Sequence, residues 1–224
     1  MQPVKRITAA MLLSVPFVVV APAATAEALE LSANVSLVSD YVSRGYSYSN
    51  GRPALQGGFD LEHESGLYAG IWGSSVSASA IAEGSDGVEL DLYAGFAGEL
   101  GMLGYDLGVA HYIFPGSQPR KDTDSTELYL GVSWEFLSLT YYRDIDFKSN
   151  YYNLDIAYPM LDNLTLDASI GYTDPDDDAS YRDWRLGAST EQFGLNLGLH
   201  YISSNVKDEP NFDDVLVLSL TKYF

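Results

Sequence analysis

The chain has 224 residues, with 12 Lys and Arg against 31 Asp and Glu, which gives a formal net charge of −19. A surface of this sign repels phosphate groups, so the composition excludes a nucleic-acid-binding protein. The sequence contains no cysteine, which excludes disulfides and thiolate metal sites.

Residues 1–26 have the pattern of a secretory signal peptide: a basic start, an apolar stretch and the small residues "ATA" before the cleavage point. A membrane-anchoring helix is the alternative. Pro16 and Pro22 interrupt the apolar run, however, and it is short for the ~20 residues that a spanning helix needs. We therefore expect cleavage after Ala26 and a single exported domain over residues 27–224.

The mature chain alternates apolar and polar residues with the period of two that is typical of β-strands. In "LSANVSLVSDYV", for example, Leu31, Val35 and Leu37 alternate with Ser32 and Asn34. The pattern predicts about twelve strands, within a range of 10–14, and no helix of any length. Besides this first segment, the alternating segments are 54–64, 67–76, 88–96, 103–113, 126–136, 138–146, 151–158, 164–172, 181–190, 193–203 and 214–224.

The connections between these segments differ in length. Most even-numbered links are short, such as "ESG", whereas most odd-numbered links are long and acidic, such as "PGSQPRKDTD". An outer-membrane barrel has this layout, with short periplasmic turns, longer external loops and both termini on the short-turn side.

Alternation alone does not say which face meets water. A barrel of about twelve strands is too wide for inward apolar side chains to fill, so we expect the leucines to face lipid. Phe224 ends the chain on the same face as Leu216, Leu218 and Leu220, which resembles the signal that outer-membrane assembly machinery recognises. We predict a closed antiparallel transmembrane β-barrel with an aromatic girdle formed by Tyr41, Tyr141, Tyr152, Tyr158, Tyr172 and Tyr201.

Residues 39–75, "SDYVSRGYSYSNGRPALQGGFDLEHESGLYAGIWGSS", contain a more specific motif. The SDYxxRG stretch, the PALQGG strand start and the GxYxGxW segment together resemble the TorF-type porin family of proteobacteria. The resemblance implies an outer-membrane location and a pore role. It carries no established substrate or binding residues, because the family is itself named by inference.

The predicted lumen is mostly acidic, and rings of carboxylates favour cations. We expect Arg44, near the outer end of the first strand, to contact a carboxylate across the strands, with Gln56 and Asp60 on the same inner face. Tyr68, Trp72, Tyr93, Tyr112 and Tyr129 are expected to point inward, where they either line a path or plug it. The candidate pore-lining residues are Asp40, Arg44, Asp60, Glu62, Glu89, Asp91, Asp106, Glu127, Asp155, Asp167, Asp183 and Arg185, with His200 as a further candidate.

The sequence thus predicts a porin for passive diffusion of small solutes, with a cation bias. A non-conducting structural or receptor barrel, whose charges pair and fill the lumen, is the first alternative. An outer-membrane enzyme of lipase or protease type is the second. No GxSxG elbow is present and His63, His111 and His200 are far apart in the chain, so we expect no enzyme.

We expect no cofactor and no metal site. The acidic run at 174–178 could bind calcium, but it lacks the EF-hand spacing. The expected partners are outer-membrane lipid and lipopolysaccharide, together with the barrel-assembly machinery through the strand that ends in Phe224. The expected location is the outer membrane of a Gram-negative bacterium.

Overall fold

The computed structural model describes residues 29–81, 85–117 and 123–224. The predicted signal peptide and its cleavage site lie outside the described residues. No helix in the described part of the chain is long and apolar enough to cross a membrane.

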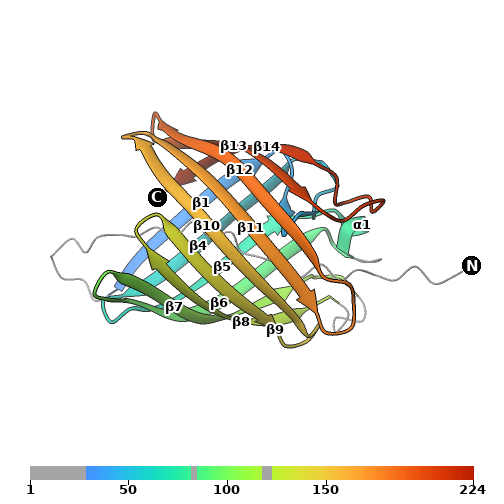
Figure 1. Ribbon diagram of the computed structural model, residues 1–224, viewed down its shortest axis with the longest axis horizontal. Helices are drawn as coiled ribbons and strands as arrows, with labels where there is room; N and C mark the ends of the chain where they lie inside the picture. Colours follow the sequence, from blue (N-terminus) through green and yellow to red (C-terminus); the bar gives the residue numbers. More distant parts are fainter. Residues whose placement is uncertain (1–28, 82–84, 118–122) are drawn as a thin grey trace, which may run out of the picture.

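Twelve antiparallel strands close into a barrel, as the sequence predicts (Figure 1). Each strand pairs with its neighbour along the chain, and the last strand pairs with the first, so the ring leaves no free edge. In ring order the strands are β1 (Leu29–Val38), β14 (Val215–Tyr223), β13 (Leu195–Ser204), β12 (Tyr181–Gln192), β11 (Leu164–Pro175), β10 (Ser149–Leu161), β9 (Leu137–Asp144), β8 (Ser125–Trp134), β7 (Leu103–Ile113), β6 (Val88–Leu100), β5 (Leu67–Ser75) and β4 (Ala54–His63).

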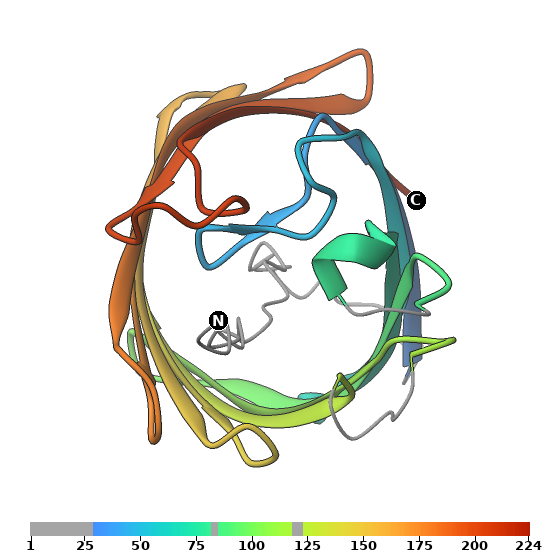
Figure 2. The ribbon, with the colours of Figure 1, turned by 90° about the vertical axis from the view of Figure 1, so that its right-hand side faces the viewer.

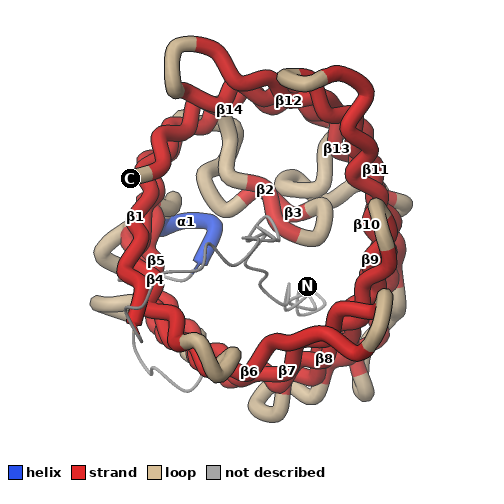
Figure 3. Tube along the Cα trace, turned by 90° about the vertical axis from the view of Figure 1, so that its left-hand side faces the viewer, coloured by secondary structure: helices blue, strands red, loops and turns tan. Residues whose placement is uncertain are grey.

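Three short elements do not belong to the wall. They are β2 (Val42–Ser43) and β3 (Tyr46–Ser47), which pair as a hairpin, and the single-turn helix α1 (Ala78–Ile81). The two end-on views place all three inside the ring of strands (Figures 2 and 3). The segment 39–53, which joins β1 to β4, therefore turns into the barrel.

The two ends of the barrel differ as predicted. Turns of two or three residues at 64–66, 101–102, 135–136, 162–163 and 193–194 form one end, which we call the short-turn end. The opposite, long-loop end carries 39–53, 145–148, 176–180 and 205–214, together with the described residues 76–81, 85–87, 114–117 and 123–124. Strand β1 begins and β14 finishes at the short-turn end, where the amide of Phe224 donates to the carbonyl of Ala33 at 2.9 Å.

The outer face of the wall is an apolar belt. Leu31 and Leu186, for example, remain 69% and 64% exposed, although hydrophobic residues of this size are usually buried in soluble proteins. On β12, Asp183 and Arg185 lie on the opposite, inner face, and Arg182, at the long-loop end of the strand, lies over the ring of Tyr172 on the outer face. The leucines thus point outward, as we expected.

The aromatic residues on the outer face match the predicted girdle except at one position. Tyr141, Tyr152 and Tyr172 lie ring against ring across β9, β10 and β11, and Tyr158 packs against Phe136. The prediction for Tyr41 is wrong. Strand β1 ends at Val38, so Tyr41 belongs to the inward segment, where it is 6% exposed.

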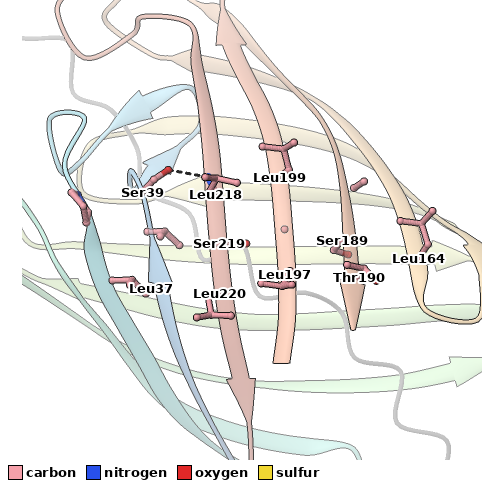
Figure 4. A pocket seen from close by; sticks show the side chains of 14 residues that line it. Leu37, Ser39, Leu164, Ser189, Thr190, Leu197, Leu199, Leu218, Ser219 and Leu220 are labelled. Carbon is pink, nitrogen blue, oxygen red and sulfur yellow. Dashed lines mark hydrogen bonds between the residues drawn. The ribbon is translucent and has the colours of Figure 1, made fainter. Parts of the chain in front are cut away.

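A groove of about 680 Å³ lies across the outer face of β11–β14 and β1 (Figure 4). Six of its 14 lining residues are leucines, and Ala188 lies among them. The groove forms part of the apolar belt.

The orientation of the wall gives a stability prediction. Leu92→Arg places a charge on the outer face near the middle of β6, and we expect it to lower the free energy of unfolding by about 2–4 kcal/mol. Leu100→Arg, at the short-turn rim of the same strand, is the matched control and costs about 0–1 kcal/mol. Urea titration of both variants refolded into phosphatidylcholine vesicles measures the difference. Equal losses would contradict the assignment of this face to lipid.

Candidate functional site: a loop folded into the lumen

The segment 39–53, called here the inward loop, is bonded to both neighbouring loops of the long-loop end. The amide of Ser47 donates to the carbonyl of Asn211 at 2.7 Å, and the amide of Ser77 donates to the carbonyl of Tyr48 at 2.7 Å. The Tyr46 hydroxyl also donates to the carbonyl of Ala80 at 2.8 Å. The inward loop, the α1 segment and the loop 205–214 therefore form one structure within the barrel (Figure 2).

The tip of the inward loop is a two-residue hairpin turn. Val42 pairs with Ser47, and Ser43 with Tyr46, which leaves Arg44 and Gly45 as the turn. Their φ angles are +49° and +77°, the combination found in type I′ turns, where Asn-Gly is the common choice. An arginine costs more than an asparagine in this left-handed conformation. We conclude that this position requires the arginine side chain.

Gly45 is needed for a second reason, because the hairpin touches the wall at this point. A Cβ atom on Gly45 would lie 3.0 Å from Cβ of Ser204 and 3.1 Å from Cβ of Asp183. These two residues belong to β13 and β12. Arg44 and Gly45 thus form the turn of the hairpin, and Gly45 also lets the hairpin lie close to β12 and β13.

Arg44 reaches the far side of the barrel. Its Nη1 atom lies 2.8 Å from Oε1 of Glu127, and its Nη2 donates to Oε2 at 2.9 Å. Glu127 lies on β8, and β4, β5, β6 and β7 all stand between that strand and β1 on the shorter way round the ring. Both side chains are 1% exposed. A two-point guanidinium–carboxylate contact therefore joins the inward loop to the opposite wall.

Aromatic rings complete the surroundings of Arg44. The guanidinium carbon lies 4.3 Å from the ring centroid of Tyr151 and 5.3 Å from that of Tyr142. The Tyr112 hydroxyl donates to Oε2 of Glu127 at 2.9 Å. Burial alone lowers the pKa of Arg44, but the charge of Glu127 more than offsets this effect and the pKa is raised. Arg44 is therefore a buried cation with a matched anion.

Asp40 organises the base of the inward loop. Its Oδ1 atom accepts hydrogen bonds from the hydroxyls of Ser47 at 2.6 Å and Ser49 at 2.7 Å, and from the amide of Gly51 at 3.2 Å. All these partners lie within the inward loop. Asp40 thus fixes the shape of the inward loop from within.

Two carboxylates, Glu89 and Asp91, lie beside the aromatic base of the inward loop. Both side chains are fully buried. Tyr41 packs against Tyr48 and Trp72, with ring centroids 5.2 and 5.6 Å apart. Burial, together with the charges of Glu89 and Asp91, raises the pKa of Tyr41 well above its ordinary value, so this phenol stays protonated.

Below the inward loop, tyrosines and aspartates share the wall of β4–β8. The Tyr68 hydroxyl donates to Oδ1 of Asp106 at 2.6 Å, and Tyr93 donates to Asp60. The rings lie across glycines on the neighbouring strands, because a Cβ atom on Gly70 or Gly95 would collide with Tyr93 or Tyr68. The rings therefore lie flat against the wall.

The wall of β10–β13 has a different character. Arg185 contacts Asp155 at 3.2 Å and Asp167 at 3.1 Å, and Nε2 of His200 lies 3.1 Å from Oδ2 of Asp167. All four side chains are partly open to solvent. No group of three or more His, Asp or Glu side chains among the described residues is arranged to hold a metal ion.

Most of the candidate pore-lining residues face inward, but they divide into two groups. Arg44, Glu127, Glu89, Asp91 and Asp183 lie buried around the inward loop. The remaining wall residues are only partly covered or exposed: Asp60, Glu62, Asp106, Asp155, Asp167 and Arg185.

Two placements made from the sequence are wrong. Neither Asp40 nor Arg44 continues the first strand, because β1 ends at Val38. The carboxylate partner of Arg44 is Glu127 rather than Asp60 on the adjacent strand. Tyr142 and Tyr151 were not predicted from the sequence, because only the fold brings them to Arg44.

The comparisons with known proteins agree with this architecture. The KdgM porin has the same fold, with a TM-score of 0.61 and 8% identity over 86% of this chain and 98% of that chain. The NanC porin matches with a TM-score of 0.56 and 8% identity over 86% and 98%. An outer membrane channel from Pseudomonas putida F1 matches with a TM-score of 0.50 and 15% identity over 92% and 100%.

The protein thus has a porin-type β-barrel fold. A model of a family of bacterial proteins of unknown function, Gcw_chp, matches residues 22–218, and the chain belongs to this family. No protein of curated function matches the sequence.

The Arg44–Glu127 pair predicts a change in protease sensitivity. Glu127→Gln leaves a buried cation without its counter-charge, which costs about 3–5 kcal/mol if the loop stays in place. We expect the inward loop to leave the lumen instead and expose the Arg44–Gly45 bond to trypsin. The following basic residue, Arg52, precedes a proline and resists trypsin, so cleavage within the inward loop reports on Arg44 alone.

Mass spectrometry of the released N-terminal fragment measures this cleavage. We expect the rate to rise at least tenfold over that of the unmodified protein. Asp106→Asn, which removes a lumen carboxylate remote from Arg44, is the matched control and should leave the rate unchanged. Equal rates for Glu127→Gln and the unmodified protein would contradict the anchoring role of this pair.

Proposed function

We propose that the protein is an outer-membrane channel of the porin class, through which small solutes diffuse. The observation that carries this proposal is the closed barrel with an apolar outer face and a charged, polar inner face. The fold similarity to two porins and an outer membrane channel supports it. The "SDYVSRG" stretch further supports a porin of the TorF type.

The charge of the lumen favours cations. Near the short-turn end the wall presents Asp60, Glu62 and Asp106, with Arg185 as the cation on the other side. Carboxylates along a pore attract cations and repel anions. A KdgM porin structure is a complex with oligogalacturonate, an anion, whereas the acidic lumen of this chain disfavours solutes of that charge.

The inward loop supports one alternative. It fills the lumen at the long-loop end, which also fits a non-conducting structural or receptor barrel. We favour the channel, because the Tyr and Asp side chains below the loop lie against the wall and remain partly open to solvent. Conduction then depends on how far the inward loop leaves its position.

We also propose that the protein is not an enzyme. His63 bonds to Ser65 in an exposed turn, His111 lies beside Thr126 on the outer side, and His200 pairs with Asp167 in the lumen. The three histidines thus lie in three different places. Outer-membrane lipid, lipopolysaccharide and the assembly machinery, through Phe224, remain the proposed partners in a Gram-negative outer membrane.

Planar-bilayer conductance tests the channel. The amide of Tyr48 donates to the carbonyl of Tyr41 at 2.7 Å, so an Asn-Gly turn in place of residues 42–47 joins these two residues with the same closing bond. Asp40 loses Ser47 in this variant but keeps its bonds to Ser49 and Gly51. We expect this shortened variant to conduct severalfold more than the unmodified protein, with a reversal potential that favours K⁺ in a KCl gradient. The Asp60→Asn/Asp106→Asn double variant should reduce that preference.

Asp176→Asn is the control for the selectivity measurement, because Asp176 lies in a long-end loop and pairs with Arg143 at 2.8 Å outside the lumen. Its selectivity should equal that of the parent protein. If the unmodified and the shortened proteins both insert and stay electrically silent, the non-conducting barrel replaces our proposal.

A further inference from the structure

We propose that the buried pocket around the Arg44 guanidinium is a guanidinium-recognition site of the barrel, and that Arg44 is its tethered occupant. The pocket, called here the cage, consists of Glu127, Tyr112, Tyr142 and Tyr151. A soluble guanidinium compound takes the same place when Arg44 leaves. The role of this site in passage of solutes rests on the proposed function, whereas the binding itself does not.

The geometry of the cage suits a guanidinium group better than an ammonium group. Nη2 of Arg44 donates a hydrogen bond to Oε2 of Glu127 at 2.9 Å, and Nη1 makes an ion-pair contact with Oε1 at 2.8 Å, so the carboxylate meets two nitrogens of one planar group. The rings of Tyr151 and Tyr142, 4.3 and 5.3 Å from the guanidinium carbon, supply cation–π contacts to the same planar group. An ammonium ion keeps the charge and the cation–π attraction but lacks the planar pair of nitrogen donors.

The wall builds the cage without help from the inward loop. Tyr112, Glu127, Tyr142 and Tyr151 lie on β7, β8, β9 and β10, four consecutive strands of the ring. Tyr112 holds Glu127 through its hydroxyl at 2.9 Å, and the Tyr151 hydroxyl lies 3.2 Å from Oδ1 of Asp183. Because these bonds do not involve Arg44, the cage keeps its shape when that side chain is absent.

Arg44 is itself an imperfect occupant. Its Nε atom is buried and has no hydrogen-bond partner within the described residues, and its backbone adopts a φ of +49°. An unpaired buried donor and a left-handed backbone both oppose docking. A free guanidinium compound that binds in the same cage bears neither cost.

Direct binding to the Arg44→Ala variant tests the proposal. We would titrate the refolded full-length barrel in detergent with methylguanidinium chloride and with methylammonium chloride at equal ionic strength, using isothermal titration calorimetry. We expect one methylguanidinium per barrel, bound at least tenfold more tightly than methylammonium. The unmodified protein should bind at least tenfold more weakly than the variant, because Arg44 occupies the cage.

Two further variants make the result specific. Arg44→Ala/Glu127→Gln should lose the binding at least tenfold, since the two-point acceptor is gone. Arg185→Ala is the matched control. It vacates a guanidinium held by the carboxylates of Asp155 and Asp167, with no ring in cation–π contact among the described residues, and should bind methylguanidinium no better than methylammonium.

Circular dichroism and heat-dependent mobility in SDS gels verify that each variant is folded; where Arg44→Ala does not fold, Arg44→Met takes its place. Equal affinities for the two cations, or binding that survives Glu127→Gln, would overturn the proposal and leave only nonspecific attraction to an acidic lumen. Binding by a barrel that never conducts would keep the site and overturn the proposed function. Conductance without selective binding would keep the proposed function and overturn the guanidinium-recognition site.

Discussion

A closed sheet of twelve strands encloses more space than its inward side chains can fill, and this constraint governs the rest of the structure. The space can hold water, or the chain can supply a segment to occupy it. The inward loop fills the long-loop end, where residues such as Tyr48 and Phe114 are almost fully buried, while Glu62 near the short-turn end remains exposed. Among the described residues, the inward loop thus closes the barrel at the long-loop end.

A segment inside a barrel stays there only if specific interactions hold it. Backbone bonds to Asn211 and Ser77 hold the inward loop to its neighbours, but those residues are themselves in loops. Arg44 is different, because Glu127 belongs to the rigid wall. A buried charge without a partner is very costly, so the pair allows few positions for the loop. The pair therefore contributes more to where the loop lies than to the total stability of the barrel.

Periodicity divides each strand into an apolar and a polar face, and the width of a twelve-stranded barrel then assigns the apolar face to lipid. Together these predicted the outward orientation of Leu31, Val35 and Leu37, and the even number of strands predicted both ends at the short turns. Periodicity cannot report where a strand stops and a loop folds back. Val38 and Ser39 interrupt the apolar–polar alternation, but Tyr41 has the same parity as Leu31, Val35 and Leu37. The sequence therefore predicted a first strand several residues too long, with Tyr41 in lipid.

The partner of Arg44 was unpredictable for a related reason. Contacts across neighbouring strands follow from register, whereas Glu127 is 83 residues away and reaches Arg44 only because the loop crosses the lumen. One signal was available. An "RG" pair flanked by Val-Ser and Tyr-Ser has the form of a two-residue hairpin turn, with an arginine where asparagine is usual. A charged side chain at such a turn indicates a specific partner elsewhere in the fold.

The glycines and tyrosines, which are unusually numerous in this sequence, explain why the rest of the lumen is not filled as well. Tyr68 and Tyr93 face Gly95 and Gly70 on adjacent strands, and each ring occupies the place of the missing side chain. A tyrosine beside a larger residue would stand upright and extend into the lumen. Beside glycine it lies along the wall, and its hydroxyl reaches a carboxylate such as Asp106 on a nearby strand. Tyrosine thus lines this part of the barrel, and the closure depends on the loop that carries Arg44.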